Sequence, residues 1–316
     1  NAGMARGNSQ YPYGKLSDLN VTDQQLAFAA QMAYEDEIPS IEVFDKLGEG
    51  WKEEKKYYID HSSGLQAHVF KNSATQEIII AFRGTEETFK DLLITDGGYI
   101  ARGDDINNPQ ALEARKYLEN IINDPDFQGY NIVLTGHSLG GYLAADCGAR
   151  YKIPTVTFNA AGMNLYDNLN TSKLSEIISE KMKNSWFVPV SVKKALIWLE
   201  GDIKVGDQYK RNISDPQIRE IAENEKAGAY DDLIRNYRYK DDLIGSFGYR
   251  PGKTYNIQSD GSIELAEDAK GLDNKKSLSW GHSISNFTGY DEGKKVDTPI
   301  VDLYGKDGNI VPRKKE

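Results

Sequence analysis

Cysteine is almost absent from this sequence, and the other common metal ligands do not cluster. The 316 residues include one cysteine, Cys147, so no disulfide can form within the chain. Nothing in the cysteine content ties the protein to an oxidising compartment. The four histidines are scattered and no glycine-rich phosphate loop occurs, so we expect no metal and no other cofactor. We expect Cys147 to be a small buried apolar residue.

Long apolar runs and excess positive charge are also lacking. No run of about 18 apolar residues occurs, so we expect no transmembrane segment. Lysine and arginine number 38 against 48 acidic residues, and the net charge of −10 argues against nucleic acid as a partner. The sequence begins NAGMARGNSQ, without the apolar stretch of a signal peptide. We therefore expect a protein that is cytoplasmic, or secreted after processing.

Strand-like and helix-like segments alternate along the chain. Hydrophobic residues make up 39% of the sequence, enough for the core of one domain over residues 1–316. Three β-rich runs at 57–60, 65–71 and 76–82 predict an antiparallel meander. The alternation that follows favours an α/β fold with a mostly parallel central sheet flanked by helices.

A long insertion interrupts this pattern. A strand at 153–160 is followed by a mostly helical stretch, 162–239, which is far longer than a plain crossover needs and predicts a helical cap. Its most amphipathic part, 184–201, carries Leu196 and Leu199 on one apolar stripe. The sequence leaves open whether this helix covers a site or packs as an extra helix.

The strongest chemical signal is GHSLGG at 136–141, which contains the arrangement G-x-S-x-G as Gly136, Ser138 and Gly140. The strand-like NIVLT precedes it and a helix rich in small residues follows it. A serine on such a turn has strained backbone angles, and its neighbours must lack colliding side chains. The helix that follows directs its N-terminal dipole at developing negative charge. We therefore predict that Ser138 is a nucleophile.

A nucleophilic serine needs a base and an acid that orients the base. In one large class of serine hydrolases the chain order is Ser, then Asp or Glu, then His. His61 and His68 precede the serine and His137 adjoins it, which leaves His282 as the base.

The acid must lie between Ser138 and His282, on a loop after a strand. Asp241 and Asp242 follow the strand-like NYRY and have the best setting. Three further aspartates in the insertion are weaker candidates: Asp202, Asp207 and Asp215.

Together these segments resemble the class 3 lipases, the fungal-type triacylglycerol lipases and their bacterial relatives. The resemblance covers roughly residues 25 to 290 and rests on five segments in family order: IIIAFRGT at 78–85, GHSLGG at 136–141, TVTFNAAG at 155–162, KDDLI at 240–244 and GHSISNF at 281–287. It implies the α/β-hydrolase fold. It also implies that Asp242, rather than Asp241, is the acid, and that Thr85 is one oxyanion-hole donor, with the N–H of Leu139 as the other.

One departure from the family concerns the lid. Fungal-type lipases carry it between the FRGT strand and the nucleophile, where this chain, at 86–108, has few large apolar residues.

The sequence therefore predicts a lipase-like serine ester hydrolase that forms an acyl-enzyme. The resemblance implies an acylglycerol or phospholipid substrate and transient contact with a lipid surface. Esterases, thioesterases, acyltransferases and peptidases use the same machinery, and a non-catalytic lipid-binding protein is the alternative from another class.

Overall fold

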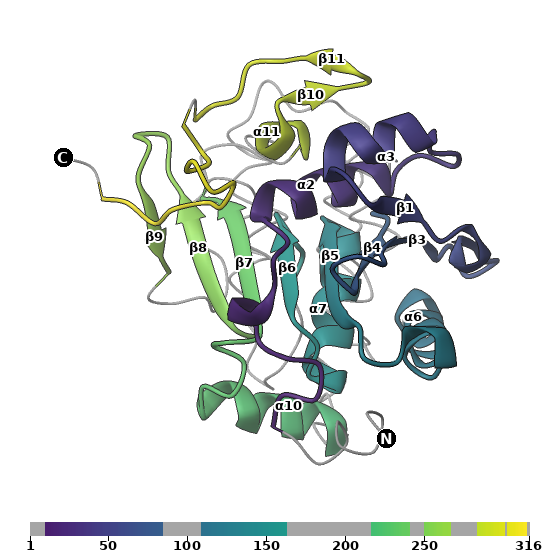
Figure 1. Ribbon diagram of the computed structural model, residues 1–316. Coiled ribbons are helices and arrows are strands. Elements are labelled where there is room, and N and C mark those ends of the chain that lie inside the picture. Colours follow the sequence, from purple (N-terminus) through teal and green to yellow (C-terminus); the bar gives the residue numbers. More distant parts are fainter. Residues whose placement is uncertain are drawn as a thin grey trace, which may run out of the picture.

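Figure 1 shows the computed structural model, which describes residues 10–84, 109–162, 216–240, 250–266, 283–300 and 302–314. Several sequence predictions lie outside these residues. They are Thr85, Asp202, Asp207, Asp215, Asp241, Asp242, His282, the stretch 86–108 and the helix at 184–201. They remain predictions.

A central sheet organises the described residues. Its strand order is β1-β3-β4-β5-β6-β7-β8-β9, with β2 paired to β3. The pairs from β4 to β8 are parallel, while those among β1 to β4 and between β8 and β9 are antiparallel. The mostly parallel sheet predicted from the sequence is therefore confirmed. The strands are β1 (Trp51–Glu53), β2 (Ile59–Asp60), β3 (Gln66–Asn72), β4 (Glu77–Phe82), β5 (Asn131–His137), β6 (Thr155–Phe158), β7 (Ile234–Tyr239), β8 (Lys253–Ile257) and β9 (Ile263–Leu265).

Helices cover both faces of this sheet. Ile78 and Ile80 of β4 face one apolar cluster, and Ile79 faces the other, because side chains alternate along a strand. The first cluster includes α6 (Pro109–Ile122), α7 (Leu139–Tyr151) and α10 (Pro216–Lys226). The second includes α2 (Asp23–Met32), α3 (Ser40–Leu47) and α11 (Ser285–Thr288). Burial on both faces explains why β4 and β5 are nearly all apolar.

Local hydrogen bonds and strand pairings support this arrangement, and they include the predicted antiparallel meander. The capping box of α2 is present, with Thr22 Oγ1 accepting from the N–H of Gln25 at 3.1 Å. The antiparallel meander, the crossover β5-α7-β6 and a hairpin between β8 and β9 all form. The remaining short elements are η1 (Leu16–Asp18), η2 (Lys55–Tyr57), η5 (Pro125–Phe127), β10 (Tyr290–Asp291) and β11 (Lys294–Lys295).

The range predicted as an insertion, 162–239, overlaps β7 at its end. This strand begins at Ile234 and pairs in parallel with β6 from its first residue. The strand-like NYRY covers 236–239, and the pairing with β6 adds Ile234 and Arg235. In the described part of this range, α10 is the helical element.

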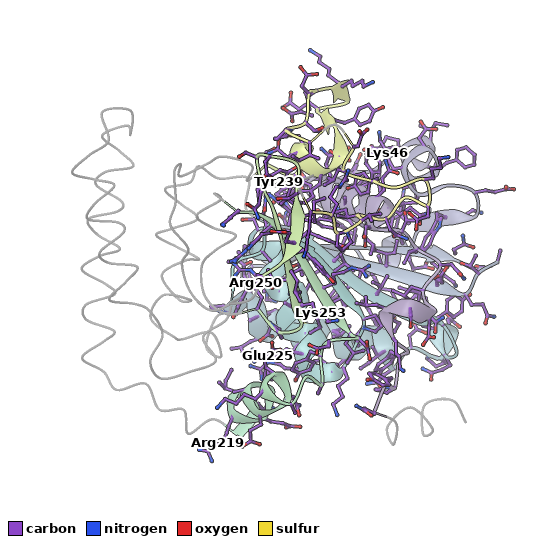
Figure 2. The ribbon with its side chains drawn as sticks, turned by 90° about the vertical axis from the view of Figure 1, so that its left-hand side faces the viewer. Lys46, Arg219, Glu225, Tyr239, Arg250 and Lys253 are labelled. Atoms are coloured by element: carbon purple, nitrogen blue, oxygen red, sulfur yellow. The ribbon has the colours of Figure 1, made fainter. Side chains whose placement is uncertain are left out.

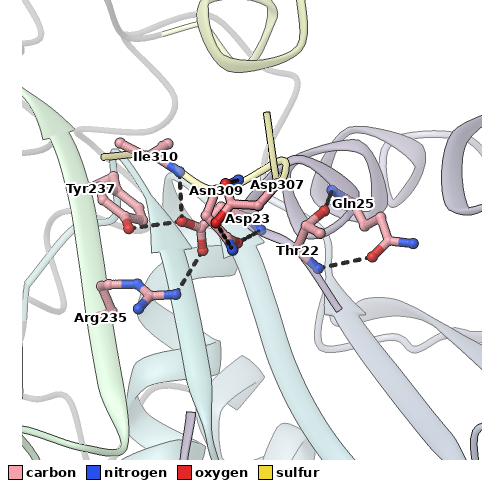
Figure 3. Close-up of polar contacts among 8 residues, drawn as sticks. All are labelled: Thr22, Asp23, Gln25, Arg235, Tyr237, Asp307, Asn309 and Ile310. Atoms are coloured by element: carbon pink, nitrogen blue, oxygen red, sulfur yellow. Dashed lines mark hydrogen bonds and ion pairs between the residues drawn. The ribbon is translucent and has the colours of Figure 1, made fainter. Parts of the chain in front are cut away.

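The two ends of the chain meet at Asp23, the first residue of α2. Its buried carboxylate accepts hydrogen bonds from Arg235 and Tyr237 of β7, each at 2.8 Å, and from the N–H of Ile310 at 3.0 Å (Figure 3). The Asp23 N–H donates to Asn309 Oδ1. This Asp23 cluster ties α2, the sheet and the C-terminal segment together. Among the described residues, no helix is both long and apolar enough to span a membrane.

Candidate active site

The candidate nucleophile, Ser138, lies on the turn between β5 and α7, where the sequence predicts it. Its backbone angles are φ 58° and ψ −122°. A side chain makes positive φ costly, so such a conformation persists only where the surrounding structure enforces it. Backbone hydrogen bonds do this here. The Ser138 N–H donates to the carbonyl of Phe158 at 3.1 Å, and the Ser138 carbonyl accepts from Ala161 at 3.3 Å.

The glycines around Ser138 are required by close packing. A Cβ on Gly136 would overlap the Gly140 carbonyl, and one on Gly140 would overlap the Phe82 carbonyl and lie 2.9 Å from the Gly84 nitrogen. A Cβ on Gly141 would lie 2.5 Å from Ala160 Cβ. All three sites are too tight for a side chain, which is the physical reason for the spacing G-x-S-x-G-G.

The side chain of Ser138 is buried and makes no hydrogen bond to another described residue. The residue is 2% exposed, and its Oγ has no hydrogen-bond partner among the described residues. A buried hydroxyl without a partner is costly and therefore uncommon in native proteins. This one lies at the N-terminus of α7, where the first N–H groups of a helix have no partner within it. The amide of Leu139 is the first of these, and its role as an oxyanion donor stays a prediction.

The three histidines in the described residues have side-chain contacts with other residues. Both ring nitrogens of buried His68 are engaged, by Glu53 at 2.6 Å and by a backbone carbonyl at 2.6 Å. His61 belongs to a surface turn with Ser63 and Glu113. His137 Nδ1 lies 2.7 Å from the hydroxyl of Tyr34. These contacts agree with the elimination that selected His282.

His61 forms an arrangement that resembles a second triad. Its Nδ1 lies 2.9 Å from Ser63 Oγ, and its Nε2 lies 3.5 Å from a Glu113 carboxylate oxygen. However, Nδ1 also accepts a hydrogen bond from the Ser63 N–H at 3.0 Å, and Ser63 Oγ accepts from the N–H of Leu65. These contacts close a surface turn and provide no helix N-terminus, so Ser63 serves as a control below.

A charged cluster fixes α7 beneath the serine. Asp146, which is fully buried, accepts from Arg115 Nε and from Arg150 Nε, each at 3.0 Å. Cys147 is buried beside it, as predicted, and burial raises the pKa of its thiol well above its usual value. A thiol with a raised pKa stays protonated and unreactive. The ion pair between Arg115 and Asp146 joins α6 to α7, the helix that begins at Leu139.

Two further side chains support the edges of the turn, and the sequence did not single them out. Arg250 is 2% exposed and donates from Nε and Nη2 to the Ala160 carbonyl, at 3.0 and 2.7 Å. In Figure 2 it lies between Tyr239, at the carboxyl end of β7, and Glu225 of α10. Tyr34, which packs against the apolar cluster that includes α2, contacts His137. No local pattern marks either residue, because both act through contacts distant in sequence.

The residues that lead to the other predicted site positions converge on the same edge. His137, Phe158 and Tyr237 are neighbours across parallel strands, and Tyr239 ends β7 three residues before Asp242. The Tyr239 hydroxyl donates to the carbonyl of Asn286, in the helix α11 that follows His282, at 2.8 Å.

A serine on a strained strand-to-helix turn, at the carboxyl edge of a mostly parallel sheet, defines a serine hydrolase of the α/β-hydrolase fold. Residues 25–184, just over half of the chain, match the Tle-like phospholipase domain, and the chain belongs to this family. The predicted relationship to lipase-like ester hydrolases is thereby confirmed.

Individual relatives are more distant. The extracellular phospholipase A1 of Serratia liquefaciens is 36% identical over 110 residues, which are 34% of this chain and 30% of that protein. The match thus spans about a third of the length of this relative. The Rhizomucor miehei lipase propeptide complex is 11% identical, with 91% of this chain and 85% of that chain covered and a TM-score of 0.44. Lipase II from Rhizopus niveus is 14% identical, with 87% and 95% covered and a TM-score of 0.44.

Proposed function

We propose that this protein hydrolyses a carboxylic ester of a phospholipid or acylglycerol through an acyl-enzyme on Ser138. The observation that carries the proposal is the buried Oγ of Ser138, which has no partner among the described residues, on a strained turn at the N-terminus of α7. Strain and an unsatisfied hydroxyl both cost stability, and they are retained at sites of chemistry.

The proposed reaction forms an acyl-enzyme and then hydrolyses it. Ser138 Oγ attacks the ester carbonyl while His282 takes its proton, and Asp242 holds the imidazole in the required tautomer. The amides of Leu139 and Thr85 stabilise the oxyanion. His282 then protonates the leaving alcohol, and water, activated by the same histidine, releases the fatty acid.

Two observations support the roles of Asp242 and His282. Asp242 follows β7 by three residues, and β7 ends on the same edge of the sheet as β5 and Ser138. His282 precedes α11 by three residues, and Phe287 of α11 packs against Phe158 and Tyr239 with ring centroids 5.0 and 5.1 Å apart. The chain therefore approaches both residues from the edge that carries the serine.

Family membership favours a phospholipid over a simple ester. The matched domain is described as a phospholipase, and the Serratia relative is named a phospholipase A1. An acyl-enzyme mechanism cleaves the bond between fatty acid and glycerol, since the serine attacks a carboxyl carbon. We therefore expect free fatty acid and a lysophospholipid as products, after transient contact with a lipid surface.

A substrate panel tests this function. Wild-type protein, Ser138→Ala and Ser63→Ala are compared on phosphatidylcholine vesicles, triacylglycerol, p-nitrophenyl esters of increasing chain length and peptide amides. We expect wild-type protein and Ser63→Ala to release fatty acid, and Ser138→Ala to lose about 10⁶-fold in kcat. Folded wild-type protein that hydrolyses only peptide amides, or no substrate at all, would contradict the proposal.

A further inference from the structure

Tyr34 lies two residues after the end of α2 and touches the residue that precedes the nucleophile. Its hydroxyl is 2.7 Å from His137 Nδ1, and the two rings meet edge to face with centroids 5.9 Å apart. The hydrogen bond joins residues 103 positions apart in the sequence. Tyr34 thus connects the helical layer to the carboxyl end of β5.

The same hydroxyl also packs against the end of β4. A Cβ on Gly84 would overlap the Tyr34 hydroxyl and lie 2.7 Å from the carbonyl oxygen of His137. The hydroxyl therefore occupies the joint between Gly84, two residues after β4, and His137, the last residue of the parallel strand β5. Thr85 follows Gly84 directly, and Leu139 follows His137 by two residues, so each strand end leads to one proposed oxyanion donor.

The segment that carries Tyr34 is itself clamped to the sheet. The Glu35 carbonyl accepts from His68 Nε2 of β3 at 2.6 Å. Asp36 pairs with Arg83, next to Gly84, at 2.9 Å. Because α2 fixes the backbone before Tyr34 and these contacts fix it after, Tyr34 can hold the joint at a set width.

We propose that Tyr34 is a positioning residue whose hydroxyl sets the separation of the two backbone amides that bind the oxyanion. This inference rests on the proposed function. The hydroxyl is the atom that distinguishes tyrosine from phenylalanine, and it lies at the joint rather than in the apolar core. Catalytic donors must be held within about 0.5 Å of their working positions, and a 1 Å displacement costs about 10²-fold in rate.

The test is Tyr34→Phe, which removes the hydroxyl and keeps the ring. We expect kcat on a soluble p-nitrophenyl ester to fall by about 10- to 100-fold while KM stays within twofold, because donors to the oxyanion act in the transition state. A boronic acid, whose serine adduct carries a similar negative charge, should bind more weakly by a comparable factor. An amide analogue of the substrate, which forms no charged adduct with the serine, should bind as tightly as to wild-type protein.

The matched control is Tyr230→Phe. Its buried hydroxyl donates to the Ala149 carbonyl near the C-terminal end of α7, far from the turn. The Tyr230 hydroxyl also accepts from Asn224 Nδ2 at 3.3 Å. Both variants lose hydrogen bonds of a tyrosine hydroxyl, so both should lower the melting temperature slightly. We expect only Tyr34→Phe to change kcat.

Two substitutions of His137 show whether the Tyr34 hydroxyl acts through the His137 imidazole. Asparagine can present a polar atom near the position of Nδ1, whereas leucine cannot. In His137→Leu, adding Tyr34→Phe should have little further effect, and in His137→Asn it should still lower kcat. A double-mutant cycle measures this dependence.

Three results would overturn the inference: kcat of Tyr34→Phe within twofold of wild type, an equal loss in Tyr230→Phe, or full additivity with His137→Leu. An inactive wild-type protein would instead contradict the proposed function. The two failures are therefore distinguishable.

Discussion

The two ends of α2 are held by different chemistry. At its first residue, Asp23 forms a buried charged cluster with Arg235, Tyr237 and the backbone of Ile310 (Figure 3). Just beyond its last residue, Tyr34 places one neutral hydroxyl against His137. The first end joins segments from both termini of the chain, and the second adjoins the nucleophile.

This difference separates stability from catalysis within one helix. A buried carboxylate with three donors is costly to disrupt, since losing it leaves a guanidinium and a phenol without their partner. A neutral hydrogen bond contributes only about 1 kcal/mol to stability. We therefore expect damage at Asp23 to weaken the fold and damage at Tyr34 to slow the reaction.

The largest effect should come from Asp242, which follows β7, the strand that the Asp23 cluster anchors, by three residues. Asp242→Asn should lower kcat by about 10⁴-fold, because an amide stabilises the wrong tautomer of His282. Asp241→Asn is the control and should change kcat far less. Steady-state kinetics on a soluble ester measures both, and the reverse outcome would move the acid by one residue.

Asp23→Ala should have the next largest effect, and it should be on stability. We expect the free energy of unfolding to fall by about 3 kcal/mol, because Arg235 and Tyr237 lose their acceptor. At 25 °C the folded variant should keep kcat within a few-fold of wild type. Urea unfolding measures the loss, with Asp45→Ala on the exposed face of α3 as the control. A stable but inactive Asp23→Ala would remove the distinction between the two ends.

Tyr34→Phe should show the opposite balance. Its free energy of unfolding should change by about 1 kcal/mol or less, as for one neutral hydrogen bond, while kcat falls as inferred above. Urea unfolding of Tyr34→Phe and Asp23→Ala under the same conditions compares their free energies of unfolding directly. If Tyr34→Phe lost as much stability as Asp23→Ala, the Tyr34 end of α2 would also stabilise the fold.

The smallest effect concerns Glu35, which adjoins Tyr34. Burial, followed by a hydrogen bond and repulsion from Glu42, raises the pKa of Glu35 from 4.5 to about 8. Its contribution to stability is fully present below pH 4.5 and is lost as pH rises to about 8, because the unfolded chain releases this proton earlier. Glu35→Gln should therefore flatten the decline in melting temperature between pH 5 and pH 8. Exposed Glu37→Gln should leave the decline unchanged.

The parts of the site that depend on local sequence could be predicted, and the rest could not. GHSLGG specifies the turn, the start of α7 and the glycine clearances within a few residues. No local pattern marks the role of Tyr34, because its partner His137 lies 103 residues away. The same holds for Asp23, because its partner Ile310 lies 287 residues away.

The boundaries of strands show the same limit. The start of β7 at Ile234 depends on pairing with Thr155, which no local pattern encodes. Thr85, Asp242 and His282 remain predictions from motif order.

Active-site labelling tests the central claim most directly. Folded wild-type protein is treated with a fluorophosphonate, digested and analysed by mass spectrometry, beside Ser138→Ala and Ser63→Ala. Only a serine whose hydroxyl is activated by a base reacts readily. The account predicts one adduct, on Ser138, that disappears in Ser138→Ala and persists in Ser63→Ala. An adduct on another serine, or none on protein that hydrolyses esters, would contradict it.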